Sequence, residues 1–143
     1  MPKSQRLLIV LCAALCTVFL ASAALAGPAE EFREGIAAAR AGDMDKAMAI
    51  FTRVIEDGAK DAGTDVKNLA SAYNLRGMCH DAKNEAEQAL ADYSKAIELD
   101  AKMAEAYGNR AMLYMKLGDV DKAKADATAA KRIDRKVKVP HFE

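Results

Sequence analysis

The sequence repeats itself at a fixed interval, and this periodicity restricts the fold more than any other feature of the chain. One constant shift of the sequence superimposes Tyr107 on Tyr73, Arg110 on Arg76, Ala111 on Gly77, Ala123 on Ala89 and Ala130 on Ala96. A second, somewhat longer shift superimposes Gly77 on Gly35, Ala89 on Ala47, Tyr93 on Phe51 and Ala96 on Val54. The longer interval suggests the same unit with an insertion of about two helical turns. The chain is therefore predicted to be an array of similar units that bury their apolar surfaces against one another.

Each unit has the pattern of two amphipathic helices joined by a tight turn. In the last unit, Gly118 can adopt the left-handed conformation that ends one helix, and Asp119 can cap the next. The other expected caps are Asp43, Thr64 and Asn84, the last with Glu87 at capping-box spacing. The pattern predicts helices at about 29–40, 44–56, 65–82, 85–99, 102–117 and 120–133.

These residues resemble the tetratricopeptide repeat (TPR) family, whose unit has an aromatic residue, a small residue four positions later, a Gly-Asp-like turn, an alanine, an aromatic residue and a second alanine. The matching residues are Gly35, Gly42, Asp43, Ala47 and Phe51 in the first unit, Tyr73, Gly77, Ala89, Tyr93 and Ala96 in the second, and Tyr107, Ala111, Tyr114, Gly118, Asp119, Ala123 and Ala130 in the third. The departures are Glu31 at the first aromatic position, Asn84 and Glu85 at the second turn, and Ala127 at the last aromatic position. The resemblance implies an all-α, right-handed α–α superhelix, a TPR-like solenoid of about six antiparallel helices, with units at 28–61, 70–103 and 104–137.

Residues 1–26 differ in character from the repeats and are interpreted as a secretory signal peptide. Lys3 and Arg6 precede an apolar run, and the stretch ends in Ala24-Leu25-Ala26, as expected for cleavage before Gly27. The predicted organisation is thus a signal peptide at 1–26, a repeat domain at 27–137 and a flexible tail at 138–143, in a secreted or periplasmic protein. Residues 7–26 are also long enough to span a membrane, so an uncleaved anchor is the alternative.

Charge content bears on the class of partner, and cysteine content bears on how the fold is stabilised. Lysine plus arginine equals aspartate plus glutamate, 21 of each, so neither nucleic acid nor an anionic surface is indicated. Cleavage of the leader would remove Lys3 and Arg6 and leave 19 basic and 21 acidic residues, a net charge of −2. It would also leave Cys79 as the only cysteine, so the mature fold would depend on packing and not on an internal disulfide.

The C-terminal residues are predicted to be loosely held. No seventh helix is evident to cap the array, so either the tail folds over the last helix, another chain covers it, or its alanine-rich and charged outer face is itself soluble. A basic cluster follows, made of Lys131, Arg132, Arg135, Lys136 and Lys138. We attribute this cluster to the favourable interaction of cations with a helix C-terminus, and not to nucleic-acid binding.

In the resembling family, the first helix of each pair lines a concave groove that holds peptide segments. The corresponding positions are Phe32, Ile36, Ala39 and Arg40 in the first unit, Asn74, Met78 and Asp81 in the second, and Glu105, Asn109, Met112, Met115 and Lys116 in the third. The resemblance implies an apolar, methionine-rich groove with a charged border, which can adapt to a partner. Alternatively, each methionine fills the core, because apolar residues at helical spacing are typical of a core face.

Some members of the family grip a partner's terminal carboxylate with lysines, asparagines and an arginine in the groove. The corresponding positions here hold Phe32, Ile36, Leu75, Glu105 and Asn109. Because this set lacks the basic residues, a C-terminal peptide held in this way is not expected.

Cys79 and His80 place a thiol next to an imidazole in the predicted mature chain. Adjacent residues on a helix point about 100° apart, so they do not readily share a metal or act as nucleophile and base. The first of the two shifts places them on Leu113 and Tyr114, which are packing positions in the resembling family. A buried structural cysteine is therefore favoured, and no metal or cofactor is expected.

The sequence contains no catalytic signature of the Gly-x-Ser-x-Gly, Gly-Lys-Ser/Thr or His-Glu-x-x-His type. We therefore predict a non-enzymatic scaffold or adaptor that binds a protein or peptide segment in its groove. One alternative is a self-associating structural protein, such as a homodimer, whose groove is filled by another copy. A further alternative is an accessory protein whose Met78, Cys79 and His80 handle a metal. A membrane contact is expected only if the leader is not cleaved.

Overall fold

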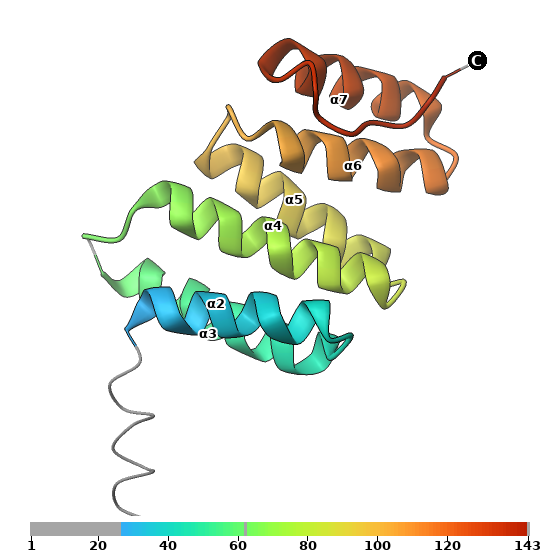
Figure 1. The fold of residues 1–143 in the computed structure, drawn as a ribbon. Coiled ribbons are helices and arrows are strands. Elements are labelled where there is room, and N and C mark those ends of the chain that lie inside the picture. Colours follow the sequence, from blue (N-terminus) through green and yellow to red (C-terminus); the bar gives the residue numbers. More distant parts are fainter. Residues whose placement is uncertain (1–26, 62, 143) are drawn as a thin grey trace, which may run out of the picture. The chain divides into compact units, whose positions relative to one another are not determined.

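The computed structural model describes residues 27–61 and 63–142. This part of the chain forms the helices α2 (Pro28–Arg40), α3 (Met44–Lys60), α4 (Val66–Ala82), α5 (Ala86–Leu99), α6 (Ala104–Lys116) and α7 (Val120–Ile133) (Figure 1). It contains no strand, so the predicted all-α class is confirmed. None of these helices is both long and apolar enough to cross a bilayer. The leader predicted at 1–26 lies outside the described residues.

The helix ends agree with the predictions to within about one turn. α3 continues to Lys60, beyond the predicted end at Glu56. α4 is capped by Asp65, whose carboxylate accepts a hydrogen bond from the backbone N–H of Lys67, so the prediction of Thr64 as the cap was wrong. α6 begins at Ala104, slightly later than the predicted start at Lys102.

A residue in the left-handed conformation ends the first helix of each pair. Gly42 and Gly118 have φ angles of 85° and 83°, and Asn84 occupies the same place in the second pair with φ of 60°. Asparagine is one of the few non-glycine residues that visit this region routinely. Because Asn84 is used for the turn, Glu85 takes the N-cap position of α5 and makes no side-chain cap hydrogen bond. The predicted capping box was therefore wrong.

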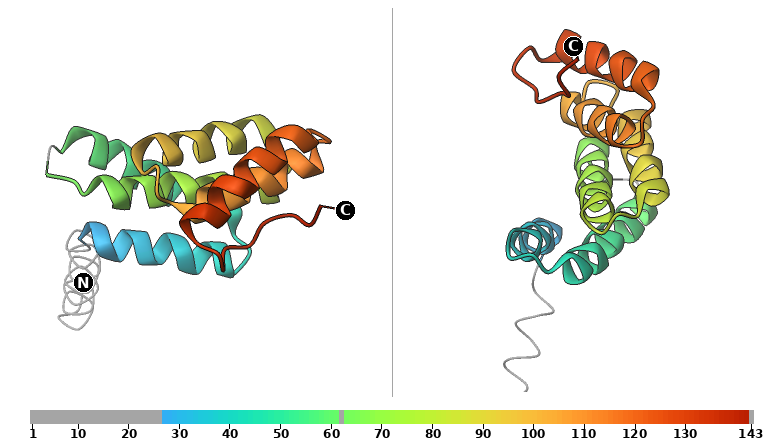
Figure 2. Two further views of the ribbon diagram at one scale, coloured as in Figure 1. Left: turned by 90° about the horizontal axis from the view of Figure 1, so that it is seen from above. Right: turned by 90° about the vertical axis from the view of Figure 1, so that its right-hand side faces the viewer.

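The helix pairs are stacked from Phe32 onward, the part of the chain that forms one compact unit. α4 packs against α5 and α6 against α7, while α3 contacts α4 and α5 contacts α6 across the junctions (Figure 2). Buried clusters follow this order, and their largest members are Phe51, Tyr93 and Leu113. The helices α4 and α6 also touch each other directly, and this contact positions the site described below.

Glycine and an aromatic ring meet where the two helices of a pair cross. A Cβ atom on Gly35 would lie 2.7 Å from Cε1 of Phe51, and one on Gly77 would lie 2.9 Å from both Cδ1 and Cε1 of Tyr93. Real Cβ atoms do not approach other atoms so closely, so the aromatic ring at each crossing requires a glycine opposite it. The spacing from the glycine to its aromatic partner is the same in both pairs, as expected for equivalent contacts in a repeated unit.

In the third helix pair, two alanines take the place of the glycine and the aromatic residue. The positions equivalent to Gly77 and Tyr93 hold Ala111 and Ala127, at the same spacing along the chain, and both alanines are buried. Where the ring is absent, the Cβ that glycine lacks can be present, because the volume at the crossing is shared between the two positions.

A partly buried ion pair joins the two helices of the second repeat unit. The Nε and Nη2 atoms of Arg76 in α4 donate hydrogen bonds of 2.8 Å to the two carboxylate oxygens of Asp92 in α5. Its Nη1 donates to the hydroxyl of Thr52 in α3 at 3.1 Å. The Arg76 side chain is 20% exposed and that of Asp92 8%. This bidentate geometry, the strongest kind of arginine–carboxylate contact, fixes three helices relative to one another.

The same ion pair recurs at the equivalent positions of the next unit. Arg110 in α6 donates to both oxygens of Asp126 in α7, at 2.7 and 2.8 Å, and to the hydroxyl of Ser94 in α5 at 2.9 Å. Hydrogen bonding to the aspartate is the largest influence on each arginine and raises the pKa of Arg76 and of Arg110. Each arginine therefore bonds the aspartate on the partner helix of its own repeat unit and a hydroxyl on the preceding unit. The stack is thus held by hydrogen bonds and ion pairs as well as by packing.

The segment after α7 packs back onto the last helix pair. Val137 and Pro140 are buried, and Val137 joins a cluster with Ala104 of α6 and Ala130 of α7. The ammonium group of Lys131 donates to the carbonyl oxygens of Arg135 and Val137 at 2.9 and 2.6 Å. Of the arrangements considered for the end of the array, the structure thus has the tail folded over the final pair. The flexibility expected for residues 138–143 stays a prediction.

Candidate binding pocket

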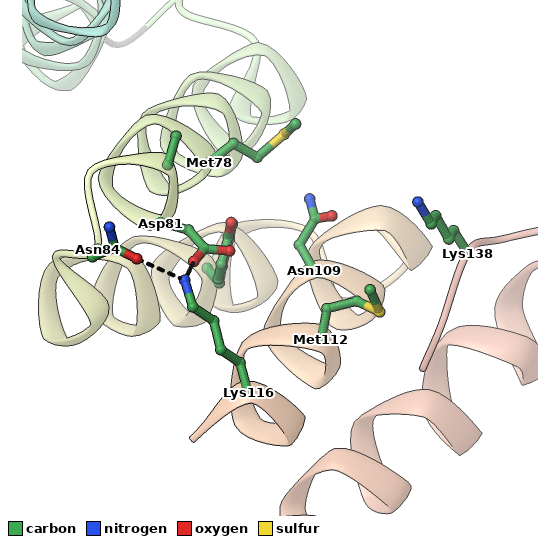
Figure 3. Close-up of a pocket in the computed structure, with 9 residues that line it drawn as sticks. Met78, Asp81, Asn84, Asn109, Met112, Lys116 and Lys138 are labelled. Carbon is green, nitrogen blue, oxygen red and sulfur yellow. Dashed lines mark hydrogen bonds and ion pairs between the residues drawn. The ribbon is translucent and has the colours of Figure 1, made fainter. Parts of the chain in front are cut away.

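A pocket of about 450 Å³ lies where α4 and α6 run next to each other (Figure 3). Met78, Asp81 and Ala82 of α4 line one side, and Asn109, Met112 and Lys116 of α6 line the other. Tyr93 of α5, Asn84 of the α4–α5 turn and Lys138 of the C-terminal segment complete it. The pocket therefore draws on two successive repeat units and on the chain that follows them.

The two methionines give the pocket its apolar character. Met78 and Met112 occupy the same position in successive units, so both side chains lie on the same side of the stack (Figure 3). They are 45% and 39% exposed, so both side chains present apolar surface to the pocket. The alternative that these two methionines fill the helical core is thus not what the structure shows.

Polar groups are arranged around the methionines. The ammonium group of Lys116 donates to a carboxylate oxygen of Asp81 at 3.2 Å and to the side-chain oxygen of Asn84 at 3.0 Å, both drawn in Figure 3. The amide of Asn109 donates to the side-chain oxygen of Asn74 at 3.0 Å. These bonds link α4 to α6 and leave the second N–H of the Asn109 amide available to a ligand.

Five of the twelve predicted groove residues line the pocket: Met78, Asp81, Asn109, Met112 and Lys116. Asn74 lies beside them, buried and bonded to Asn109. Phe32, Ile36 and Ala39 are half-buried and pack against a core cluster that includes Phe51 and Cys79. The pocket does not include Arg40, Glu105 and Met115. The role of all twelve residues in binding stays a prediction.

Sequence reasoning missed four of the lining residues: Ala82, Asn84, Tyr93 and Lys138. Ala82 and Asn84 follow Asp81 closely, so extending the predicted face by one turn would have included them. Tyr93 was assigned only to packing, and burial raises its pKa well above the usual range. Lys138 had no signal at the sequence level, because it lies beyond the last repeat unit.

Met78, Cys79 and His80 face three different surroundings. Met78 lines the pocket, Cys79 is buried with Phe51, and His80 pairs through Nδ1 with Glu85 Oε2 at 2.6 Å. Burial raises the pKa of the Cys79 thiol, which lowers the fraction of reactive thiolate. Among the described residues, no group of three or more His, Cys, Asp or Glu side chains is placed to hold a metal ion.

Three family models match the chain and decide its classification. A tetratricopeptide repeat model matches residues 31–57, a TPR repeat model matches 82–118, and a further tetratricopeptide repeat model matches 104–137. The last match coincides with the third unit proposed from the sequence. The chain belongs to the tetratricopeptide repeat family. Its repeats place it among domains that generally serve as scaffolds and not as enzymes.

Solved structures of other proteins have the same fold, and two of the three described here are named as TPR domains. The TPR2B domain of yeast Sti1 in a complex with an Hsp70 peptide superposes with a TM-score of 0.66 and 27% identity, covering 77% of this chain and 82% of that one. The second TPR of Spaghetti (RPAP3), bound to the HSP90 peptide SRMEEVD, has a TM-score of 0.64 and 24% identity, covering 75% and 92%. PcrH in complex with the chaperone binding region of PopB has a TM-score of 0.64 and 24% identity, covering 74% and 79%.

No curated protein matches the sequence at a significant level. The comparisons therefore establish the repeat family and the superhelical fold of this tetratricopeptide repeat protein and support a role in protein interaction.

Proposed function

We propose that this protein is a non-enzymatic adaptor that binds a segment of a partner protein in the pocket between α4 and α6. The single observation that carries the proposal is the pair of exposed methionines, Met78 and Met112, in a pocket of about 450 Å³. Exposed apolar side chains that gather in one hollow, with polar groups around them, are the usual character of a binding site. Structural relatives that hold peptides support the same conclusion.

The chemistry of the pocket suits a protein segment. The methionine side chains can adapt their shape to an apolar residue of the partner. The Asn109 amide can bond to a peptide backbone, because it carries a second N–H beyond the one given to Asn74. The terminal-carboxylate grip of some relatives is not proposed here, because Phe32, Ile36 and Glu105 occupy positions where that grip needs other side chains.

A photo-reactive residue placed in the pocket tests this proposal. Benzoylphenylalanine at position 112 is expected to crosslink a discrete protein from an extract of the source cells. The same residue at position 91, which is exposed on α5 and does not line the pocket, is the matched control and is expected to give no such product. Mass spectrometry identifies the captured segment.

Two results would contradict the proposal. Equal capture from positions 112 and 91 would show that the reaction is not specific to the pocket. A product of twice the mass of the protein itself would favour the self-associating homodimer over an adaptor for a different partner.

The proposed location is the periplasm or the exterior of the cell, and it is supported by the leader at 1–26. The expected result is that protein purified from cells begins at Gly27, as measured by intact mass. A protein that retains Met1 and fractionates with membranes would instead support the anchored alternative.

A further inference from the structure

The pocket contains a lysine that does not belong to any repeat unit. Lys138 comes from the segment after α7 and lines the same pocket as Met78 and Met112. In Figure 3, Lys138 and Lys116 stand on opposite sides of Asn109 and Met112. A partner segment that crosses the methionines would therefore meet one lysine at each end.

The two lysines differ in how their charge is compensated. Lys116 is already bonded to Asp81 and Asn84. The ammonium group of Lys138 has no ion-pair partner among residues 27–61 and 63–142. The charged residues lining the pocket are Lys116, Lys138 and Asp81, so one positive charge remains uncompensated, and it is located at Lys138.

The backbone on either side of Lys138 is fixed in place. Its carbonyl oxygen lies 2.5 Å from where a Cβ of Gly108 would be, so only glycine at that position leaves room for it. The preceding residue, Val137, is buried, and its carbonyl oxygen accepts a hydrogen bond from Lys131. Gly108 and Lys131 thus act as positioning residues that bring Lys138 to the pocket. This role gives a structural reason for the glycine at 108 and the lysine at 131, which the repeat pattern does not explain.

We propose that Lys138 is a specificity determinant that selects partner segments in which an acidic residue lies near a large apolar residue. This inference rests on the proposed function of the pocket. The methionines take the apolar side chain, and the uncompensated ammonium group attracts the carboxylate. The complementary charge disfavours segments with lysine or arginine at that place, because like charges would face each other.

The test uses an array of random dodecamer peptides probed with the chain from Gly27 onward. The wild-type protein is expected to select peptides with aspartate or glutamate near leucine, methionine or phenylalanine. Lys138→Glu is expected to exchange this acidic preference for lysine or arginine while keeping the apolar one. Lys136→Glu is the matched control: Lys136 is exposed close by in the same segment and does not line the pocket, so the selected peptides are expected to be unchanged.

Affinity measurements on one selected acidic peptide give a second readout. Lys138→Glu is expected to weaken its binding about tenfold or more, because an attractive contact becomes a repulsive one. Gly108→Ala is expected to reduce the acidic preference without reversing it, because the added Cβ displaces the Lys138 carbonyl. Circular dichroism checks that each variant remains folded.

The outcomes separate this inference from the function on which it rests. If Lys138→Glu still selects acidic peptides, or if Lys136→Glu changes the selection equally, the role of Lys138 is overturned and pocket binding stands. If the wild-type protein selects peptides with no charge preference, the same conclusion holds. If neither the wild type nor any variant selects peptides, both the inference and the proposed function are overturned.

Discussion

Replacing Asp92 with alanine is expected to lower the free energy of unfolding by about 3–5 kcal/mol. The substitution removes the carboxylate that accepts two hydrogen bonds of 2.8 Å from Arg76. The Arg76 side chain, only 20% exposed, then keeps its charge without a carboxylate partner, because arginine does not lose its proton in proteins. Native domains are stable by roughly 5–15 kcal/mol in total, so the loss is a large share of the whole. Urea unfolding followed by circular dichroism measures it.

A surface ion pair provides the control for this prediction. Lys95 and Glu98 are 2.8 Å apart and well exposed, so Glu98→Ala is expected to cost far less than Asp92→Ala, because solvent screens the exposed pair. The double variant Arg76→Leu with Asp92→Leu is expected to recover much of the stability lost in Asp92→Ala, because no buried charge remains unpaired. If Asp92→Ala costs no more than Glu98→Ala, the ion pair does not hold the helices together as described.

The contact between Gly77 and Tyr93 predicts that the effect of Gly77→Ala on the free energy of unfolding depends on whether the Tyr93 ring is present. Tyr93→Ala is expected to destabilise the protein by about 3–5 kcal/mol, since it leaves a cavity where a fully buried ring was. Gly77→Ala is expected to cost about 1–3 kcal/mol in the wild type, because its Cβ would lie 2.9 Å from the ring of Tyr93. With Tyr93 already replaced, Gly77→Ala becomes neutral or stabilising by up to about 1 kcal/mol, because alanine favours the helix over glycine.

The double substitution also copies a contact that the protein already uses. It places at 77 and 93 the two alanines that occur at 111 and 127. The double-mutant cycle, measured by urea unfolding, is therefore expected to give a coupling energy of at least about 1 kcal/mol. Additive effects of the two substitutions would mean that the positions do not share their volume, and the equivalence of the repeat units would be in question.

The repeat interval was sufficient to predict the helix pairs and their turns, because each depends on residues within one unit. Gly42 and Gly118 were expected to end their helices, and both have positive φ angles. The ion pairs were missed, although the same shift that places Arg110 on Arg76 also places Asp126 on Asp92. The repetition of both the arginine and the aspartate could have indicated the ion pair, because an arginine that is removed from water needs an acceptor, and here the acceptor recurs at the same distance along the chain.

The candidate pocket was harder to predict, because it depends on how neighbouring units pack. Phe32 and Ile36 occupy groove positions in the family pattern, yet they pack against the core cluster around Phe51. Lys138 reaches the pocket only because the tail turns back along α6. No local pattern encodes this path, since a chain segment without helical periodicity gives no signal of its tertiary contacts.

The affinity of the captured partner segment for three forms of the protein tests the central claim most directly. The wild type, Met112→Asp and Ala91→Asp would be compared by titration calorimetry, the last as a control that adds the same charge at an exposed position outside the pocket. If a partner residue packs against Met112, its loss is expected to weaken binding about tenfold or more, while Ala91→Asp leaves the affinity within about twofold. Equal affinity of Met112→Asp and the wild type would contradict the assignment of this pocket as the binding site.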